Sequence, residues 1–451
     1  MGEGKQRVDI AAVIEEQPTS ALQYLVFTLC TLVCFVDGYD MVSIGYVAPS
    51  LRAEFHFDAA ALGPIFSAGI FGMVAGGLFF GPLADRIGRR RVLALSCLMF
   101  GAGTVLTAMA DSFLGLLLAR LAVGFGLGGA SANAFAMVAE YAAKRIAATV
   151  VVVANCGVGL GAAFGGLLAA HLIPALGWRS VLYVGGVSGL VLGLALLALL
   201  PESLRFLATH GQHAAAARYL RRMAPGLARA GGELWPVSSE EVQQGFPVRH
   251  LFTNGRAAGT VLLWVIIFLN MMQIYTVNQW LPLLINKAGV ALPAAISTGA
   301  LFQTGVVAGA LVLSRLVTRS AQPYRLLALL QLGAAVSFVA LGSAGSTVAV
   351  VMPVVFVNGI FVGGVLFNLS ALAAGYYPTY IRSTGVAWAI GIGRSGGVVG
   401  PMLGSLLLAL NLDAARIFSL AAVPAACEAV AALIMAWVLM QRAALREAPA
   451  E

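Results

Sequence analysis

Twelve long apolar stretches dominate this sequence. Each contains about 20 or more mainly apolar residues, the length that an α-helix needs to cross the hydrocarbon core of a bilayer. The expected spans are residues 21–48, 60–83, 91–110, 113–139, 146–173, 179–200, 257–286, 293–317, 325–344, 347–374, 381–410 and 414–440. We therefore expect an all-α, polytopic membrane protein with 12 transmembrane helices.

The composition excludes several classes of soluble protein. Hydrophobic residues make up 60% of the chain and charged residues only 10%, whereas about 25% charged residues is ordinary for a soluble protein. So few charges cannot cover the surface of a soluble enzyme or a nucleic-acid module. The net charge of +8 does not change this conclusion, because the basic residues lie in short runs between apolar stretches.

The distribution of Lys and Arg predicts the orientation. A basic run, Arg86 with Arg89–Arg91, follows the second span, and residues 201–256 contain seven arginines. The opposite side has only a few basic residues, namely Arg52, Arg179, Lys287 and Arg416. Because cytoplasmic loops carry the excess of Lys and Arg, we expect both termini in the cytoplasm.

Six spans, a long basic loop and six more spans predict a transporter made of two bundles that rock about a central site. An amphipathic helix is expected in the first part of the loop, at residues 202–223. The expected divisions are an N-terminal cytoplasmic segment (1–20), an N-terminal six-helix bundle (21–200), a cytoplasmic linker (201–256), a C-terminal six-helix bundle (257–440) and a cytoplasmic tail (441–451).

No sequence motif indicates an enzyme. The five cysteines all lie inside apolar segments, as expected for packing residues rather than disulfides or metal ligands. The glycine-rich stretches 124–129 and 157–161 also lie in apolar helices, where glycines allow helices to pack closely and do not form a phosphate loop. We therefore predict no catalytic residues, no bound metal and no cofactor.

The loop after the second span carries a family motif. The run Gly81-Pro-Leu-Ala-Asp85-Arg86-Ile-Gly88-Arg89-Arg90-Arg91 resembles the loop signature of the major facilitator superfamily. Similar elements of that superfamily occur as Glu140 to Arg145 and as Tyr377 to Gly385. The resemblance implies a cytoplasmic gate network made of Asp85, Arg86, Arg89, Glu140, Arg145 and Arg382. The second-half copy of the loop departs from the family in having Ser314 where Asp is usual, so no role is assigned to Ser314.

A second motif narrows the resemblance. Asp37-Gly38-Tyr39-Asp40 in the first span is similar to the Asp-Gly-(Phe/Tyr)-Asp motif of the aromatic acid:proton symporter family. Trp280-Leu-Pro282, Gly299 to Gln303 and Gly393-Arg394 agree with the same family. This resemblance implies import of small aromatic carboxylates, such as 4-hydroxybenzoate, protocatechuate or benzoate, together with protons, for aromatic catabolism. It also implies a location in a bacterial cytoplasmic (inner) membrane. The partners are then the anion, the proton and the lipid bilayer, without nucleic acid, and we expect a monomer.

Four charged residues lie well inside apolar spans: Asp37, Asp40, Arg120 and Arg394. A charge at the centre of a membrane helix costs about 3 kcal/mol or more, so these groups should be paired and face an internal cavity at mid-membrane. Asp37 and Asp40 are three residues apart and therefore project toward one helix face. The alternative is that these residues form purely structural ion bridges.

Their chemistry suggests separate roles. Asp37 and Asp40 can gain and lose a proton, and we predict them as the proton-coupling site. Arg394 is predicted to bind the substrate carboxylate through its planar fork, with Arg120 as the partner that tunes the acids. Further predicted substrate contacts are Tyr39, Asn278, Trp280, Gln303 and Trp388. Glu428 in the last span receives no role.

Two other functions remain open from sequence. One is proton-coupled import of another organic anion, such as a muconate-type dicarboxylate, which a competition panel on uptake would separate. The other is a non-transporting membrane chemoreceptor for aromatic acids. Such a receptor would bind without accumulation driven by a pH gradient and would normally need a signalling domain, for which the loops are too short.

Overall fold

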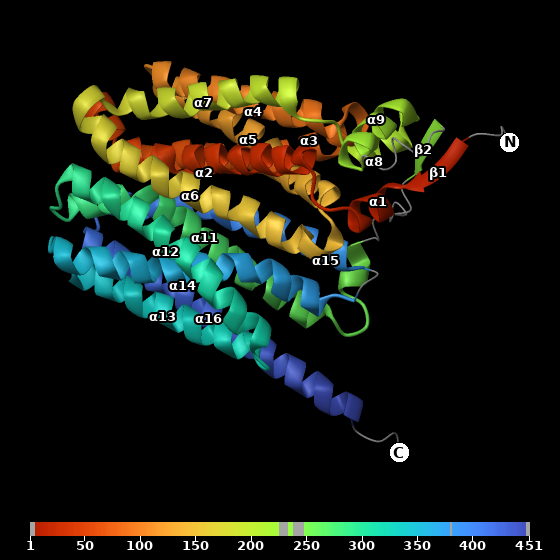
Figure 1. Ribbon diagram of the computed structural model, residues 1–451. Helices are drawn as coiled ribbons and strands as arrows, with labels where there is room; N and C mark the ends of the chain where they lie inside the picture. The colour runs from red at the N-terminus through yellow and green to blue at the C-terminus, as the bar shows by residue number, and fades with distance from the viewer. Residues whose placement is uncertain (1–4, 225–232, 238–247, 379–380, 448–451) are drawn as a thin grey trace. The chain divides into compact units, whose positions relative to one another are not determined.

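The computed structural model describes the chain except for residues 1–4, 225–232, 238–247, 379–380 and 448–451 (Figure 1). Twelve of the described helices are long and apolar enough to cross a membrane. They are α2 (Ala21–Phe55), α3 (Ala59–Ile87), α4 (Arg89–Met109), α5 (Phe113–Tyr141), α6 (Lys144–Leu176), α7 (Trp178–Leu199), α11 (Ala257–Lys287), α12 (Leu292–Arg319), α13 (Pro323–Ser343), α14 (Val348–Tyr376), α15 (Arg382–Ala409) and α16 (Ala414–Glu447). The predicted polytopic helical fold is thereby confirmed.

A few short elements lie outside the twelve spans. They are β1 (Lys5–Asp9), α1 (Ile10–Glu16), α8 (Leu204–Thr209), α9 (His213–Met223), β2 (Glu233–Val237) and the 3-10 helix η1 (Val248–Leu251). β1 and β2 form a two-stranded parallel sheet, with Lys5 opposite Glu233, which the apolar spans of the sequence could not reveal. The sequence predicts one amphipathic helix in the linker, at residues 202–223. The structure has two helices there, because Gly211, with φ 72°, ends the helical conformation between α8 and α9.

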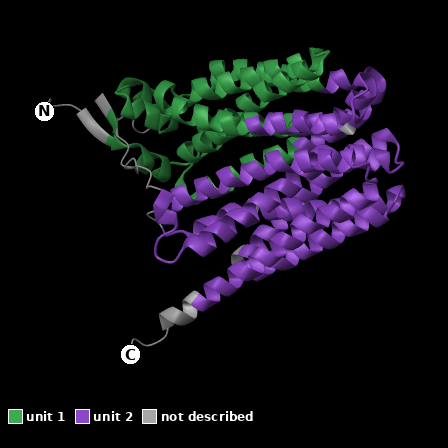
Figure 2. Cartoon of the chain, turned by 180° about the vertical axis from the view of Figure 1, so that it is seen from behind, with its two compact units in different colours: residues 1–41, 72–161, 182–243 green, residues 42–71, 162–181, 244–451 purple. Residues whose placement is uncertain are grey.

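The chain divides into two compact units (Figure 2). Unit 1 comprises residues 1–41, 72–161 and 182–243, and unit 2 comprises residues 42–71, 162–181 and 244–451. This division cuts through α2, α3, α6 and α7, so unit 2 contains segments from both halves of the sequence. The two six-helix bundles predicted from sequence stay a prediction.

Unit 1 is held together by close helix packing. A Cβ atom at Gly126 of α5 would lie 2.6 Å from the backbone nitrogen of Phe100 in α4, so the absence of a side chain lets the two backbones approach. Cys30, Cys34 and Cys97 are buried in this core as free thiols. The glycine-rich stretch in α5 is thus a packing surface.

Unit 2 joins residues 42–71 to the helices of the second half. The ring of Phe66 in α3 meets the ring of Trp280 in α11 edge-on, with 5.0 Å between ring centroids. Ser67 donates a hydrogen bond to the carbonyl of Val398 in α15, at 2.8 Å. The indole N–H of Trp280 donates to the carbonyl of Pro401 in the same helix, at 3.1 Å. These contacts tie α3, α11 and α15 together.

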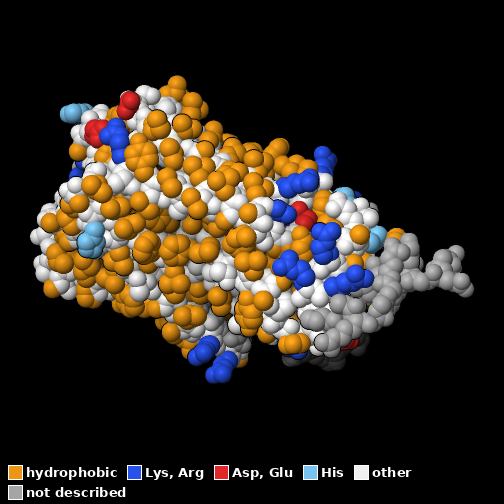
Figure 3. Space-filling model, turned by 45° about the horizontal axis from the view of Figure 1, so that its top comes forward, with side chains coloured by type: hydrophobic (Ala, Val, Ile, Leu, Met, Phe, Trp, Pro, Cys, Tyr) orange, Lys and Arg blue, Asp and Glu red, His pale blue; other side chains and the backbone are white. Residues whose placement is uncertain are grey.

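The exposed surface is largely apolar. Figure 3 shows hydrophobic side chains over most of the visible face, and large side chains such as Leu78, Val336 and Trp437 are exposed. In water a surface of this kind would aggregate or bind a partner. It fits helices whose outer faces contact lipid.

Candidate functional site

A buried polar cluster in unit 1 joins three helices. The carboxylate of Asp40 (α2) is completely buried, and an amino nitrogen of Arg120 (α5) lies 3.6 Å from its Oδ2 atom. Thr104 (α4) donates a hydrogen bond of 2.6 Å to the other oxygen, Oδ1. The Nε atom of Arg120 donates to the hydroxyl of Thr107, at 3.4 Å. One acid and one base therefore neutralise each other inside the membrane region.

Local sequence explains how α4 and α5 come together at this cluster. A Cβ atom at Gly103 would lie 2.9 Å from a methyl carbon of Val123, so a larger residue would push the two helices apart. Gly103 precedes Thr104, and Val123 lies one turn after Arg120. Removal of either charged partner would leave the other buried without compensation, a change that costs about 3–5 kcal/mol in comparable sites.

The two other predicted residues of α2 are also buried in unit 1. Asp37 lies one helical turn before Asp40 and is 5% exposed. The ring of Tyr39 is 3% exposed and packs against Gly185 of α7, where a Cβ atom would be 2.7 Å from the ring. Tyr39 thus has a packing contact within unit 1, in addition to the substrate contact predicted for it.

The remaining predicted substrate residues belong to unit 2. Asn278, Trp280 and Gln303 are buried, and Arg394 is half-buried. Trp388 is 44% exposed, and its ring stacks on Trp264 with 6.2 Å between centroids. The structure therefore groups Asp37, Asp40 and Arg120 in one unit and these five residues in the other, and a shared site stays a prediction. Among the described residues, no group of His, Cys, Asp or Glu side chains could hold a metal ion.

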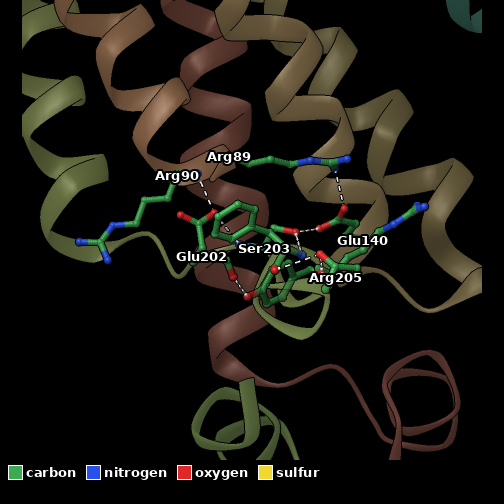
Figure 4. A network of polar contacts seen from close by, with 9 residues as sticks. Arg89, Arg90, Glu140, Glu202, Ser203 and Arg205 are labelled. Carbon is green, nitrogen blue, oxygen red and sulfur yellow. Dashed lines mark hydrogen bonds and ion pairs between the residues drawn. The ribbon is translucent and has the colours of Figure 1, made fainter. Parts of the chain in front are cut away.

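A second polar cluster lies at the ends of α4 and α5 in unit 1 (Figure 4). Arg89, the first residue of α4, forms an ion pair of 2.7 Å with Glu140 near the end of α5. The other carboxylate oxygen of Glu140 accepts a hydrogen bond from the Ser203 hydroxyl, at 2.5 Å. Ser203 also caps α8 by accepting from the backbone N–H of Phe206. Glu140 therefore connects α4, α5 and α8.

Glu202 extends this cluster on the side of α4. Its carboxylate accepts a hydrogen bond of 3.0 Å from the backbone N–H of Arg90, where an acid is favoured by the helix dipole. Its backbone carbonyl accepts from the hydroxyl of Tyr141, at 2.7 Å. Gly88 precedes α4 with φ 100°, and a side chain there would collide with the Glu202 carboxylate.

The other predicted gate residues make different contacts. Arg145 is directed to the carbonyls of Glu15 and Gln17, each at 3.3 Å, so the partner observed for Glu140 is Arg89 and not Arg145. Asp85 is exposed and lines a cavity of about 420 Å³ that Arg89 and Glu140 also line. Arg86 and Arg382 are exposed, and Arg382 donates to the carbonyl of Tyr377 at 3.4 Å.

Four residues of these clusters were not predicted from the sequence: Thr104, Thr107, Glu202 and Ser203. Glu202-Ser203 directly follows the sixth apolar span. A serine at this position could have been recognised as the N-cap of a helix. The two threonines are different, because their hydroxyls also bond to carbonyls of their own helix. Nothing in the sequence distinguishes them from threonines without a partner.

The family follows from comparison with known proteins. The family model of the Major Facilitator Superfamily matches residues 30–401. The chain belongs to the major facilitator superfamily. Its fold is that of a superfamily member, since the inward-open xylose transporter XylE from E. coli superposes with a TM-score of 0.68 at 17% identity, covering 92% of this chain and 95% of XylE.

Curated relatives within the superfamily are named transporters. The chain is 38% identical to the 4-hydroxybenzoate transporter PcaK of Acinetobacter baylyi, over 95% of this chain and 94% of that protein. It is 35% identical to the gallate transporter of Pseudomonas putida, over 94% of each chain. The resemblance inferred from the loop and first-span motifs is confirmed, and the protein is a membrane transporter rather than an enzyme.

The Arg89–Glu140 pair is open to a direct stability test. We expect Glu140→Ala to lower the free energy of unfolding in detergent by about 2 kcal/mol, because it removes one ion pair and one hydrogen bond to a charged group. Arg91→Ala, in the same basic run but exposed, is the matched control and should change it by about 0.5 kcal/mol or less. Equal effects of the two substitutions would contradict a structural role for the pair.

Proposed function

We propose that this transporter imports small aromatic carboxylates, such as 4-hydroxybenzoate, protocatechuate or benzoate, together with protons across the bacterial cytoplasmic membrane. The observation that carries the proposal is the 38% identity to a 4-hydroxybenzoate transporter over 95% of the chain. Both termini are placed in the cytoplasm, because the loops on that side hold most of the basic residues. We propose that the transporter acts as a monomer.

Proton coupling is assigned to Asp40 and Asp37. While Asp40 is ionised, its charge compensates that of Arg120 at 3.6 Å. A proton bound to Asp40 leaves the positive charge of Arg120 without compensation, and an anion is then attracted. Loss of that proton restores the pair and weakens the hold on the anion. Asp37, one turn away on α2 and also buried, provides a second carboxylate for the same exchange.

Binding of the substrate carboxylate is assigned to Arg394. A guanidinium group grips a carboxylate through two parallel hydrogen bonds and keeps its charge at any working pH. Buried amides are suited to a ring hydroxyl, and aromatic rings are suited to stacking on a benzene ring. The residues proposed for these contacts are Tyr39, Asn278, Trp280, Gln303 and Trp388.

Alternating access requires contacts that can open. The Phe66–Trp280 ring contact and the Ser67–Val398 hydrogen bond within unit 2 join helices from the two halves of the sequence. We assign them to a gate that is closed in the conformation of the structure and opens when the transporter changes conformation. The Arg89–Glu140 cluster, with Asp85, Arg86, Arg145 and Arg382, is assigned to a second gate, on the cytoplasmic side.

A transport assay tests the proposed function. Vesicles that contain the protein should accumulate labelled 4-hydroxybenzoate when the outside is made acidic, and a proton-conducting ionophore should abolish the accumulation. Unlabelled protocatechuate, benzoate and gallate should compete, whereas a muconate-type dicarboxylate should not. Preferential competition by the dicarboxylate would indicate a different organic anion as the substrate. Saturable binding without accumulation would favour a receptor.

A further inference from the structure

A carboxyl group without an assigned role is buried in unit 2. Glu428 lies in the middle of α16 and is completely buried. The side-chain amide of Gln273 in α11 donates a hydrogen bond of 2.7 Å to its Oε2 atom. Asn270, one turn earlier on α11, is also completely buried, and its side-chain amide interacts with the same carboxyl group. Two amides of α11 therefore surround one acid of α16.

If Glu428 is ionised, this group has more buried hydrogen-bond acceptors than donors. The Oε1 atoms of Glu428 and Gln273 and the Oδ1 atom of Asn270 are buried and accept no hydrogen bond from the described residues. Gln273 uses both of its amide hydrogens, on Glu428 and on the carbonyl of Leu269, and Asn270 uses one of its two on the carbonyl of Val362. One proton on Glu428 would create the missing O–H donor and satisfy an amide oxygen.

No ion pair compensates a negative charge at this position among the described residues. Helix α16 packs against α11, α13 and α15. The other described ionisable residues of these four helices are Tyr275, Lys287, Tyr324, Arg325, Arg382, Arg394, Arg416 and Cys427. The cavity beside Gln273, of about 300 Å³, is otherwise lined mainly by apolar residues such as Val277, Phe338 and Leu408, which do not stabilise an ionised carboxylate.

We propose that Glu428 is a proton-binding site separate from the acids of α2, and that it is a neutral carboxylic acid which donates a hydrogen bond to an amide oxygen of α11. The bound proton fastens α16 to α11, the helix that also carries Asn278 and Trp280. An ionised carboxylate here would be buried without a partner, at high cost. This inference goes beyond the proposed function, because it does not depend on which substrate is transported.

Infrared spectroscopy tests the protonation directly. Purified protein in lipid vesicles at neutral pH should show the carbonyl stretching band of a protonated carboxylic acid, and Glu428→Gln should remove one such band. Asp413→Asn is the matched control, since Asp413 is exposed just before the same helix and its removal should affect only the bands of ionised carboxylates. The proposal is overturned if Glu428→Gln removes ionised bands instead.

Thermal unfolding in detergent tests the hydrogen bond. Glu428→Gln keeps a donor and an acceptor, so its unfolding temperature should stay close to that of the unchanged protein. Glu428→Leu removes the acceptor of the Gln273 hydrogen bond and any O–H donor to an amide oxygen of α11, and it should unfold several degrees lower. Equal destabilisation by the two substitutions would overturn the proposal, because it would mean that the site needs a charge. Neither measurement uses substrate, so a failure of the proposed transport function would be distinguishable.

Discussion

Asp40→Asn is expected to abolish accumulation of 4-hydroxybenzoate driven by a pH gradient, while exchange of internal for external substrate continues. Asparagine has the shape of aspartate and can still accept the hydrogen bond that Thr104 donates at 2.6 Å, so α2, α4 and α5 should stay packed although the charge of Arg120 loses its partner, as it does when Asp40 binds a proton. It cannot bind and release a proton. The transporter should then equilibrate its substrate without concentrating it, as measured by uptake and by counterflow in the same vesicles.

The companion variant and the control separate coupling from folding. Asp37→Asn should also lose accumulation, because Asp37 is buried one turn away on the same helix. Asp111→Asn removes an exposed acid in the loop between α4 and α5, and it should accumulate substrate normally. Full accumulation by both Asp37→Asn and Asp40→Asn would refute the assignment of the coupling site. Loss of counterflow as well would mean that the charge of Asp40 is needed for folding or binding.

The twelve spans were predictable because lipid offers no hydrogen bonds to the backbone. A stretch that crosses it must be helical and apolar, and both properties are visible in the sequence. The helix ends were less predictable, because a helix continues into water beyond its apolar part. Thus α2 continues to Phe55 and α16 to Glu447, past the apolar stretches that end at residues 48 and 440.

Parts of the candidate site could also be predicted from the sequence. Asp40 and Arg120 stand out as charges inside apolar spans, and a buried charge needs a partner; in the structure the two lie 3.6 Å apart. Their neighbour Thr104 could not be identified, because its role depends on how α4 is rotated about its axis. The same holds for Gln273 and Asn270, which approach Glu428 from a helix distant in sequence.

Arg394→Lys is expected to raise the KM for 4-hydroxybenzoate uptake by about 10- to 100-fold, with little change in the maximal rate. Lysine keeps the positive charge but not the planar fork that forms two hydrogen bonds to a carboxylate. A hydrogen bond to a charged group contributes about 1.5–3 kcal/mol, and each 1.4 kcal/mol is about a tenfold change in affinity. Arg394→Gln, which removes the charge too, should show no saturable uptake. Initial rates over a range of substrate concentrations measure both effects.

The specific control is Arg416→Lys. Arg416 is an exposed residue in the first turn of α16, so the same chemical change there should leave the KM unaltered. A neutral methyl ester of 4-hydroxybenzoate adds a further test, because it lacks the carboxylate that Arg394 is assigned to bind. The unchanged protein should prefer the acid to the ester as a competitor, and Arg394→Lys should lose most of that preference. If Arg394→Lys keeps both the KM and the preference, the carboxylate is bound elsewhere, and Arg120 becomes the next arginine to test.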